Sequence, residues 1–526
     1  MHRSEANVRA IGDWLRSHAP AGADLRVDSR MVAAGDVFIA LPGRRTDGLR
    51  YLGQALAQGA SALLVDEQSW TGTATAAANF STAGAEPVSF RAPVLPVPEL
   101  GKALGGIAAD YYGDASRKMR TIGVTGTNGK TSSCQWIAQL LTLAGQRCAT
   151  IGTLGFGFPG VQPVQEATLT TPDAATLQRL ARKALDQGAR AFALEVSSIG
   201  LDQGRVHGMS FDVALFTNLS RDHLDYHADM ASYGAAKRKL FRWPTLSHAV
   251  LNLDDEFGRV LARDLTTGGL AVIGVGAAAD AGAEPALACR LRAEAVEHHP
   301  GGMRFRVVCE RGGTVEAAAV DVALIGDFNI TNLLGVVGVA LACGVSLSKA
   351  AAFLAELHAP PGRLQRVAAG AKCLGPLAIV DYAHTPDAIG KALLALQPLA
   401  RARGGHLLIV FGAGGDRDPG KRPLMGAVAA TGADDIVLTS DNPRSENADS
   451  IIDQVAAGIP AGVQYRRNAD RAEAIRETLH RARAGDVVLI AGKGHEDYQE
   501  ISGQRLPFSD YAVAHCALSA REGRTS

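Results

Sequence analysis

The sequence has no surplus of charge of either sign, and this absence excludes one class of function. Lys plus Arg and Asp plus Glu both number 53 among the 526 residues, so the formal net charge is zero. A general nucleic-acid binder needs a basic surplus, although a local basic pocket for a small anion remains possible. The 59 glycines and 22 prolines are also too few for a disordered chain.

Long apolar runs and paired cysteines are lacking as well. No stretch approaches the ~18–20 apolar residues that span a bilayer. The best candidate, residues 333–345, is short and contains three glycines, which favours a buried helix. The first ten residues lack the apolar segment of a secretory signal. The seven cysteines are scattered without a CxxC pair, which predicts reduced thiols in a cytoplasmic protein.

Composition breaks divide the chain. At roughly 150 residues per domain, the length suggests about three or four domains. Residues 71–98 are low in charge and rich in small residues and proline, which predicts a surface loop and the exit from a first domain. A Pro-Pro-Gly run within residues 358–363 predicts a linker. A weaker break at 277–287 predicts a loop within the middle domain. No internal repeat is evident.

Short apolar runs alternate with longer amphipathic stretches, which predicts an α/β fold with buried parallel strands. The runs begin near residues 121, 191, 213, 249, 377, 407, 435 and 486. Nearly all end in Gly, Asp, Asn, His or Thr, and ligands bind at the carboxyl ends of parallel strands. Plain turn residues would account for the Gly and Asp, but less easily for His384, Arg417, Arg444 and Glu496.

The strongest motif is TIGVTGTNGKTSS at residues 121–133, where a strand runs into a Gly-rich turn and then a helix. Exposed backbone N–H groups and a helix N-terminus hold phosphate oxygens. Lys130 would neutralise the terminal phosphates, and the Thr131 hydroxyl would bind Mg²⁺. Because Val124 breaks the strict GxxxxGK[ST] pattern, a turn that only caps a helix stays an alternative. The expected nucleotide-binding residues are Gly126, Thr127, Asn128, Gly129, Lys130 and Thr131.

Acidic and basic residues follow at two further places. Glu195 ends the run AFALEV, and a carboxylate at a strand end near a phosphate loop suits Mg²⁺. A basic helix face is the plain alternative for the segment around Lys237. A solvated loop is the plain alternative for the segment that contains Asp222, His223, Asp225 and His227.

Together these motifs resemble the Mur ligases, ATP-dependent amino-acid ligases of peptidoglycan synthesis. The resemblance runs in order from about Val27 to Gln499 through GTNGKT, EVSS, GLDQGR, TNLSRDHLDYH, AAK, GDFNITN, PGR, VDYAHTPD, GGDRDPGKRPLM, DNPR and AGKGHEDYQ. It implies three domains: a smaller N-terminal α/β domain that binds a UDP-sugar, a central parallel-sheet ATP-binding domain of phosphate-loop type, and a Rossmann-like C-terminal domain that binds the amino acid. The expected boundaries are 1–98, 99–358 and 359–526.

Two short motifs, DSR around Ser29 and DNPR at 441–444, resemble those of the family members that add meso-2,6-diaminopimelate to UDP-N-acetylmuramoyl-L-alanyl-D-glutamate. The resemblance implies uridine contacts from Val27, Ser29, Arg44, Arg45 and Thr46. It implies muramoyl-peptide contacts from Thr170, Thr171, Ser197, Gln203 and Arg205. For ATP it implies adenine contacts from Asn329 and Asn332, and contacts near the ribose from Arg363 and Asp381. For the amino acid it implies contacts from Arg417, Asp441, Asn442, Pro443, Arg444, Gly492 and Glu496.

Lys237 matches the lysine that CO₂ carbamylates in this family. A carbamate is a carboxylate-like ligand, so the resemblance implies Mg²⁺ ligation by Thr131, Glu195, His223 and carbamylated Lys237. The chain departs from the family at Ile199, where many relatives have a His, and at Leu169, where an Asn is often seen. Residues 71–98 match nothing in the family.

The implied reaction forms an amide through an acyl-phosphate, by positioning and charge neutralisation. The catalytic residues are Lys130, Glu195, His223 and Lys237, and either His223 or a nearby carboxylate could take the proton of the amine. The alternatives are the L-lysine-adding Mur ligase, a folylpolyglutamate synthase and a non-catalytic nucleotide-binding regulator. The expected partners are the small-molecule substrates alone, without nucleic acid or membrane, and the protein is expected to be a monomer.

The predicted choice of amino acid also has a physical basis. Meso-diaminopimelate carries a second carboxylate at its far end, where lysine has only an ammonium. Arg444 could hold that carboxylate through two hydrogen bonds, with Pro443 fixing the turn that aims it. Glu496 could pair with the distal ammonium. A surface salt bridge is the plain alternative for Arg444.

Overall fold

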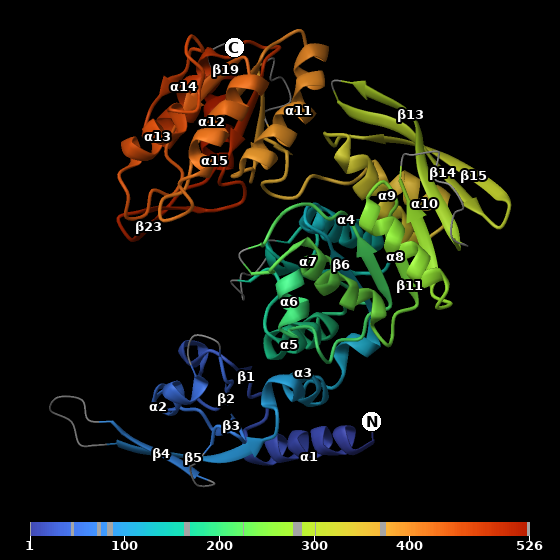
Figure 1. The fold of residues 1–526 in the computed structure, drawn as a ribbon, viewed down its shortest axis with the longest axis vertical. Coiled ribbons are helices and arrows are strands. Elements are labelled where there is room, and N and C mark those ends of the chain that lie inside the picture. The colour runs from blue at the N-terminus through green and yellow to red at the C-terminus, as the bar shows by residue number, and fades with distance from the viewer. Residues whose placement is uncertain are drawn as a thin grey trace. The chain divides into compact units, whose positions relative to one another are not determined.

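The structure is a computed structural model, and it describes residues 2–43, 47–70, 75–80, 88–161, 169–224, 226–276, 287–299, 301–368 and 375–522. It has the predicted α/β class, with three sheets rich in parallel strands, one in each domain (Figure 1). By internal contacts the chain forms two compact units. The first comprises Met1–Leu291, Glu310–Thr314 and Gly335–Ser346, and the second comprises the remainder.

The N-terminal sheet has five strands in the order β1-β2-β3-β5-β4. Its strands are β1 (Leu25–Arg26), β2 (Val37–Ala40), β3 (Ala62–Asp66), β4 (Thr75–Phe80) and β5 (Val88–Val97). Its helices are α1 (His2–His18), η1 (Ser29–Met31), η2 (Gly48–Tyr51), α2 (Leu52–Ala57) and α3 (Leu100–Tyr111). Val37 and Ile39 pack with α1 and α3, whereas Phe38 packs with α2. This alternation buries β2 on both faces.

The prediction of a surface loop over 71–98 is wrong for the residues that the structure describes there. β4 pairs with β5 in antiparallel register, and β5 pairs with β3 in parallel register. The prolines of this segment suggested a loop, but proline fixes a φ that extended backbone tolerates. Ala92, Val94 and Val97 are buried, which gives β5 an apolar anchor.

The central sheet has ten strands in the order β15-β14-β13-β12-β11-β10-β6-β9-β7-β8. The strands are β6 (Arg120–Thr125), β7 (Cys148–Gly152), β8 (Gly155–Gly157), β9 (Ala191–Glu195), β10 (Val213–Phe216), β11 (His248–Asn252), β12 (Ala271–Val275), β13 (Cys289–His299), β14 (Gly302–Arg311) and β15 (Thr314–Val322). The helices are η3 (Ala115–Lys118), α4 (Lys130–Leu143), α5 (Ala174–Asp186), α6 (Ser198–Asp202), α7 (Met230–Arg238), η4 (Lys239–Arg242), α8 (Glu256–Thr266), α9 (Phe328–Ala342) and α10 (Leu347–Leu354). The predicted buried helix is confirmed by α9, in which Leu333, Val336 and Val337 are buried.

The C-terminal sheet has the order β16-β17-β21-β18-β19-β20, with β16 antiparallel to β17 and the others parallel. Its elements are β16 (Gln365–Arg366), β17 (Leu377–Asp381), α11 (Pro386–Ala402), β18 (Leu407–Phe411), α12 (Lys421–Gly432), β19 (Asp435–Leu438), α13 (Ala448–Ala456), β20 (Arg466–Arg467), α14 (Arg471–Arg481), β21 (Val487–Ala491) and α15 (Asp510–Glu522). A separate hairpin joins β22 (Tyr498–Ile501) to β23 (Gln504–Pro507). Along β21, Leu489 and Ile490 enter clusters on opposite faces, so helices cover both faces.

All eight apolar runs that were predicted to be parallel strands form parallel strands, namely β6, β9, β10, β11, β17, β18, β19 and β21. Within the described residues, no helix is long and apolar enough to cross a membrane. None of the six described cysteines forms a disulfide bond with another described cysteine. The weak break predicted at 277–287 lies almost wholly outside the described residues.

The core of the central sheet predicts a test of stability. Phe192 of β9 is fully buried, so Phe192→Ala removes an aromatic side chain and leaves a cavity. The free energy of unfolding should fall by about 3–5 kcal/mol, and this loss is measured from the faster hydrogen exchange of the β6 and β9 amides. Leu143→Ala, on the exposed side of α4, should change the free energy of unfolding by less than about 0.5 kcal/mol. Equal effects of the two substitutions would contradict the packing described.

Candidate functional site

The phosphate loop lies between β6 and α4, and two glycines fix its shape. Gly126 has φ +153°, and a Cβ there would lie 1.9 Å from the Thr217 hydroxyl oxygen. Gly129 has φ +85° immediately before α4 begins at Lys130. A side chain at Gly126 would therefore clash and one at Gly129 would be strained. As predicted, the loop leaves a strand and enters a helix N-terminus, the geometry that binds phosphate.

Two lysines converge on one carbonyl of this loop. Lys130 Nζ donates to Gly126 O at 3.0 Å and to Thr127 O at 2.9 Å. Lys237 Nζ donates to the same Gly126 O at 2.7 Å. Lys237 is only 1% exposed. Burial, reinforced by the Lys130 charge, lowers the pKa of Lys237 to about 6. The Lys237 amine is therefore mostly uncharged at neutral pH.

Glu195 connects the phosphate loop to the next part of the site. Its Oε2 accepts hydrogen bonds from Thr131 Oγ1 at 3.0 Å and Thr153 Oγ1 at 3.2 Å. Its Oε1 accepts from Thr153 N at 2.9 Å. The carboxylate is buried at the carboxyl end of β9. A hydroxyl and a carboxylate side by side next to a phosphate loop are oxygen ligands that Mg²⁺ prefers.

The residues predicted to contact the muramoyl peptide form one connected group. Thr171 Oγ1 donates to Glu195 O at 2.9 Å and to Ser197 Oγ at 3.0 Å. Arg205 Nη1 donates to Thr171 O at 2.9 Å, and Arg205 Nε donates to Gln203 Oε1 at 3.0 Å. Thr170 joins this group through the hydroxyl of Thr153, at 3.2 Å. Thr170, Thr171, Ser197, Gln203 and Arg205 therefore lie beside Glu195.

His223 is placed differently from the other predicted metal ligands. It adopts φ +53° and lies 3.6 Å from Asp222, with 41% of its side chain exposed. Its ring contacts Tyr233, the buried aromatic residue that also lies under Lys237. No contact joins His223 to Glu195. In the described part of the chain, no group of three His, Cys, Asp or Glu residues could hold a metal.

In the N-terminal domain, the structure describes two of the five residues expected to hold uridine. Ser29 is buried and its Oγ donates to Gln54 Oε1 at 2.8 Å, while Val27 packs at the edge of a core cluster. The stretch 44–46, with Arg44, Arg45 and Thr46, lies outside the described residues.

In the second unit, the residues expected near adenine and ribose form two local groups. Asn332 Nδ2 donates to Asn329 Oδ1 at 3.1 Å in the first turns of α9, and both asparagines are buried. The Asp381 carboxylate accepts from the backbone N–H groups of Leu364 at 2.7 Å and Ala383 at 2.9 Å. These bonds fix the turn that follows Arg363.

The segment Asp441–Arg444 follows β19 and ends in an unusual backbone conformation. Arg444 has φ +52°, and its N–H donates to Glu500 O at 3.0 Å. Its Nη1 donates to Gly415 O at 2.5 Å and its Nε lies 3.6 Å from Glu500 Oε2. Among the described residues, no atom accepts a hydrogen bond from Nη2 of Arg444. Arg417 is exposed and follows the neighbouring strand β18.

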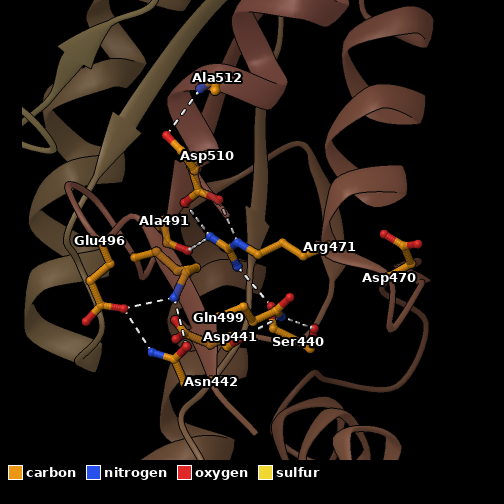
Figure 2. Close-up of polar contacts among 12 residues, drawn as sticks. Ser440, Asp441, Asn442, Asp470, Arg471, Ala491, Glu496, Gln499, Asp510 and Ala512 are labelled. Atoms are coloured by element: carbon orange, nitrogen blue, oxygen red, sulfur yellow. Dashed lines mark hydrogen bonds and ion pairs between the residues drawn. The ribbon is translucent and has the colours of Figure 1, made fainter. Parts of the chain in front are cut away.

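Asn442 links this segment to the loop after β21. Its Nδ2 donates to Glu496 Oε2 at 2.8 Å (Figure 2), while its Oδ1 accepts from Lys493 Nζ at 2.9 Å. Lys493 is fully buried and also donates to Glu496 Oε2 at 2.8 Å. Burial alone would raise the pKa of Glu496, but Lys493 lowers it below its usual value. Glu496 is thereby held as an oriented anion.

Gly492 is required where these two loops approach. It has φ +121°, and a Cβ there would lie 2.4 Å from Asp441 Oδ2. The predicted residues Asp441, Asn442, Gly492 and Glu496 are therefore brought together at the carboxyl edge of the C-terminal sheet. Pro443 precedes Arg444 in the same turn, and its carbonyl accepts from Glu446 N at 3.0 Å.

Sequence reasoning missed Thr153, Tyr233 and Lys493. Thr153 follows β7, so its place after a strand end was the only available signal. Tyr233 is fully buried, and its OH lies 3.1 Å from Thr127 Oγ1. Lys493 stands between two glycines of AGKGHED. Glycines allow another segment to approach the backbone closely, and this was the available signal for Lys493.

Family comparisons match the chain in three segments. The family described as Mur ligase family, catalytic domain, matches residues 24–112. The Mur ligase middle domain matches residues 124–340, and the Mur ligase glutamate ligase domain matches residues 362–494.

Individual relatives extend this likeness along the whole chain. A UDP-N-acetylmuramoyl-L-alanyl-D-glutamate–2,6-diaminopimelate ligase of Ralstonia nicotianae is 45% identical over 98% of this chain and 97% of its own. A solved structure of a ligase with the same name is 34% identical, covers 95% of both chains and has a TM-score of 0.64. The folylpolyglutamate synthase of Mycobacterium tuberculosis complexed with ADP is 19% identical over 73% of this chain and 90% of its own, with a TM-score of 0.55, and so shares the fold alone. The chain belongs to the Mur ligase family of ATP-dependent, amide-forming ligases.

Proposed function

We propose that this enzyme ligates meso-2,6-diaminopimelate to the D-glutamate of UDP-N-acetylmuramoyl-L-alanyl-D-glutamate in peptidoglycan synthesis, with conversion of ATP to ADP and phosphate. The observation that carries the choice of amino acid is the hydrogen bond from Asn442 to Glu496, at 2.8 Å. It links the turn that presents the Arg444 cation to the loop that presents the Glu496 anion. One cation and one anion complement the carboxylate and ammonium at the far end of diaminopimelate. The relatives that carry this substrate in their name support the same choice.

The reaction must turn a carboxylate into an acyl donor. The glutamate carboxylate attacks the γ-phosphorus of ATP, which releases ADP and forms an acyl-phosphate. The diaminopimelate amine then attacks the acyl carbon, the amine loses a proton, and phosphate leaves with the C–O bond electrons. Phosphoryl transfer of this kind depends on positioning and on neutralising charge.

The residues of the phosphate loop fit these tasks. The loop amides and Lys130 bind the phosphates of ATP, and Lys130 exchanges its bonds to Gly126 O and Thr127 O for phosphate oxygens. The connected group around Thr171 and Arg205 orients the peptide beside Glu195. Asn329, Asn332, Arg363 and Asp381 bind the adenosine part of ATP. Val27, Ser29 and the stretch 44–46 bind uridine.

Lys237 fits carbamylation on the evidence of its surroundings. Only an uncharged amine reacts with CO₂, and burial keeps Lys237 largely uncharged. As an ammonium it would face Lys130 across a single carbonyl, which is repulsive. As a carbamate it would become an anion that attracts Lys130 and would offer an oxygen ligand to Mg²⁺ together with Thr131 and Glu195, while ligation by His223, which lies apart from them, stays a prediction from the family resemblance. Mg²⁺ bound there supplies Lewis-acid charge for the phosphates.

Two alternatives are weaker. In a lysine-adding ligase Arg444 would meet no substrate carboxylate, so its cation would have no role in choosing the amino acid and only Glu500 would pair with it. A folylpolyglutamate synthase does not account for the Asp441–Arg444 turn or for an N-terminal nucleotide-sugar domain.

The domain boundaries near residues 98 and 358, the monomeric state and the cytoplasmic location stay predictions. Arg417 is proposed to bind the amino acid from the loop after β18, beside Asp441–Arg444, Gly492 and Glu496.

Lys237→Ala should abolish most activity, because it removes the group that becomes the carbamate. Added bicarbonate or a short carboxylic acid should restore part of the product formation, since a small anion can occupy the vacated space. Lys239→Ala, which removes only an exposed ion pair with Asp202, should retain activity. Full activity of Lys237→Ala without additive would refute the carbamate.

Lys130→Ala should remove about 3–5 kcal/mol of transition-state stabilisation, because a preorganised cation is lost from the phosphates. The measurement is kcat/KM for ATP in the complete ligation assay. Thermal unfolding of the ligand-free protein should barely change, since the Lys130 ammonium bonds to Gly126 O and Thr127 O, which are carbonyls of the loop itself. A near-normal rate would place the ATP site elsewhere.

Meso-diaminopimelate should be used about 10³-fold or more better than L-lysine in kcat/KM, because lysine lacks the carboxylate that Arg444 would bind. Separate reactions with each amino acid, followed by quantification of the tripeptide product, measure the ratio. Arg444→Ala should raise the KM for diaminopimelate steeply and leave that for ATP nearly unchanged. Arg466→Ala, in an exposed pair with Asp435, is the control. Equal use of both amino acids would leave only the general Mur ligase assignment.

A further inference from the structure

A buried ion pair lies at the start of two helices in the C-terminal domain. Arg471 is the first residue of α14 and Asp510 is the first residue of α15. Arg471 Nε and Nη2 donate to the two carboxylate oxygens of Asp510, each at 2.7 Å. Both side chains are 0% exposed. Figure 2 shows this two-bond pairing in one view with Asp441 and Glu496.

The same guanidinium also bonds to the ends of two strands. Nη1 of Arg471 donates to Ser440 O at 3.1 Å, just after β19, and Nη2 donates to Ala491 O at 2.9 Å, the last residue of β21. β18 lies between β19 and β21 in the sheet, so these two strands do not pair with each other. Arg471 therefore ties together two strand ends that the sheet itself holds apart.

Both tied ends lead directly into the proposed amino-acid site. Asp441 and Asn442 follow Ser440, and Gly492 follows Ala491. The backbone at Gly492 approaches the Asp441 carboxylate so closely that no Cβ fits between them. Burial raises the pKa of Asp441, and the Arg471 cation opposes this rise. Arg471 thus helps to place the loop and favours the charged form of the Asp441 carboxylate.

A buried ion pair is a poor source of stability, because the cost of desolvating two charges offsets their attraction. An apolar pair of similar volume often packs as well, so this pair needs another explanation. We propose that Arg471, oriented by Asp510, is a positioning residue for the amino-acid site. It sets the spacing between the Asp441–Arg444 turn and the Gly492–Glu496 loop. The inference rests on the proposed function, because it assumes that these two segments bind the incoming amino acid.

The test removes both charges together, so that neither is left buried and unpaired. The double variant Arg471→Met/Asp510→Leu should stay folded in thermal unfolding. Its kcat/KM for meso-diaminopimelate should fall by about 10–10²-fold, the scale that a misplacement of about 1 Å produces. The KM values for ATP and for the UDP-muramoyl dipeptide should change less than about twofold, because neither site depends on this spacing.

A matched control lies at the other end of the same helix pair. Arg521 Nη1 donates to the carbonyls of Leu479 at 2.6 Å and Ala482 at 2.7 Å, so it ties the end of α15 to the end of α14. Arg521→Met removes this arginine–carbonyl contact far from the strand ends that carry the site. It should lower the unfolding temperature without a selective loss for the amino acid.

Arg471→Lys provides a second route to the same answer should the double variant fail to fold. A lysine keeps the charge opposite Asp510, but its one nitrogen cannot reproduce the rigid, planar set of bonds that the guanidinium makes to Asp510, Ser440 O and Ala491 O. The selective loss for diaminopimelate should therefore persist in this variant.

A folded variant with wild-type kcat/KM for diaminopimelate would overturn the inference. An equal loss for all three substrates, or the same selective loss in Arg521→Met, would also overturn it, because either result indicates general loosening. The wild-type enzyme is assayed first. If it does not use meso-diaminopimelate, the proposed function fails, and the same comparison is then made with the amino acid that the wild-type enzyme uses.

Discussion

A parallel strand that is covered on both faces has room for polar side chains only at its ends. This constraint governs both large sheets of the molecule. β9 is apolar until Glu195, and β17 is apolar until Asp381. Because parallel strands align their carboxyl ends, the polar residues that end them collect at one edge of each sheet. The candidate chemistry of the protein is thus concentrated there by the packing of its core.

Buried basic side chains are the second feature that the two sheets share. Lys237 in the central domain, and Lys493 and Arg471 in the C-terminal domain, are almost completely excluded from solvent. Each is bonded to a carbonyl or amide oxygen of a site loop, and two of them also to a carboxylate. Basic groups are costly to bury, so they persist in such positions where they orient a loop or take part in chemistry.

The sequence allowed the strands, the phosphate loop and most of the site residues to be predicted, because strand periodicity and glycine spacing are local signals. It did not allow the β4–β5 pairing to be predicted, since proline in a strand looks like proline in a loop. Nor could it show that Lys493 and Arg471 are buried. A lysine or arginine has the same letter on a surface as beneath a site, and only the assembled sheet distinguishes the two. The grouping of Glu195 with Thr131 followed from strand order, whereas the separate position of His223 did not.

The hydrogen bond from Asn442 to Glu496, which joins the turn of Arg444 to the loop of Glu496, has a stereochemical consequence for the proposed substrate. The two ends of meso-diaminopimelate are mirror images of each other, so they carry the same groups with opposite handedness. A cation and an anion held in fixed relative positions, together with the direction in which the chain must leave toward the acyl-phosphate, give three points of attachment that fit one of these ends and not its mirror image. The end that is left over presents its amine to the acyl-phosphate. A site of this kind therefore selects a single diastereomer of product from a molecule that has two chemically equivalent amines.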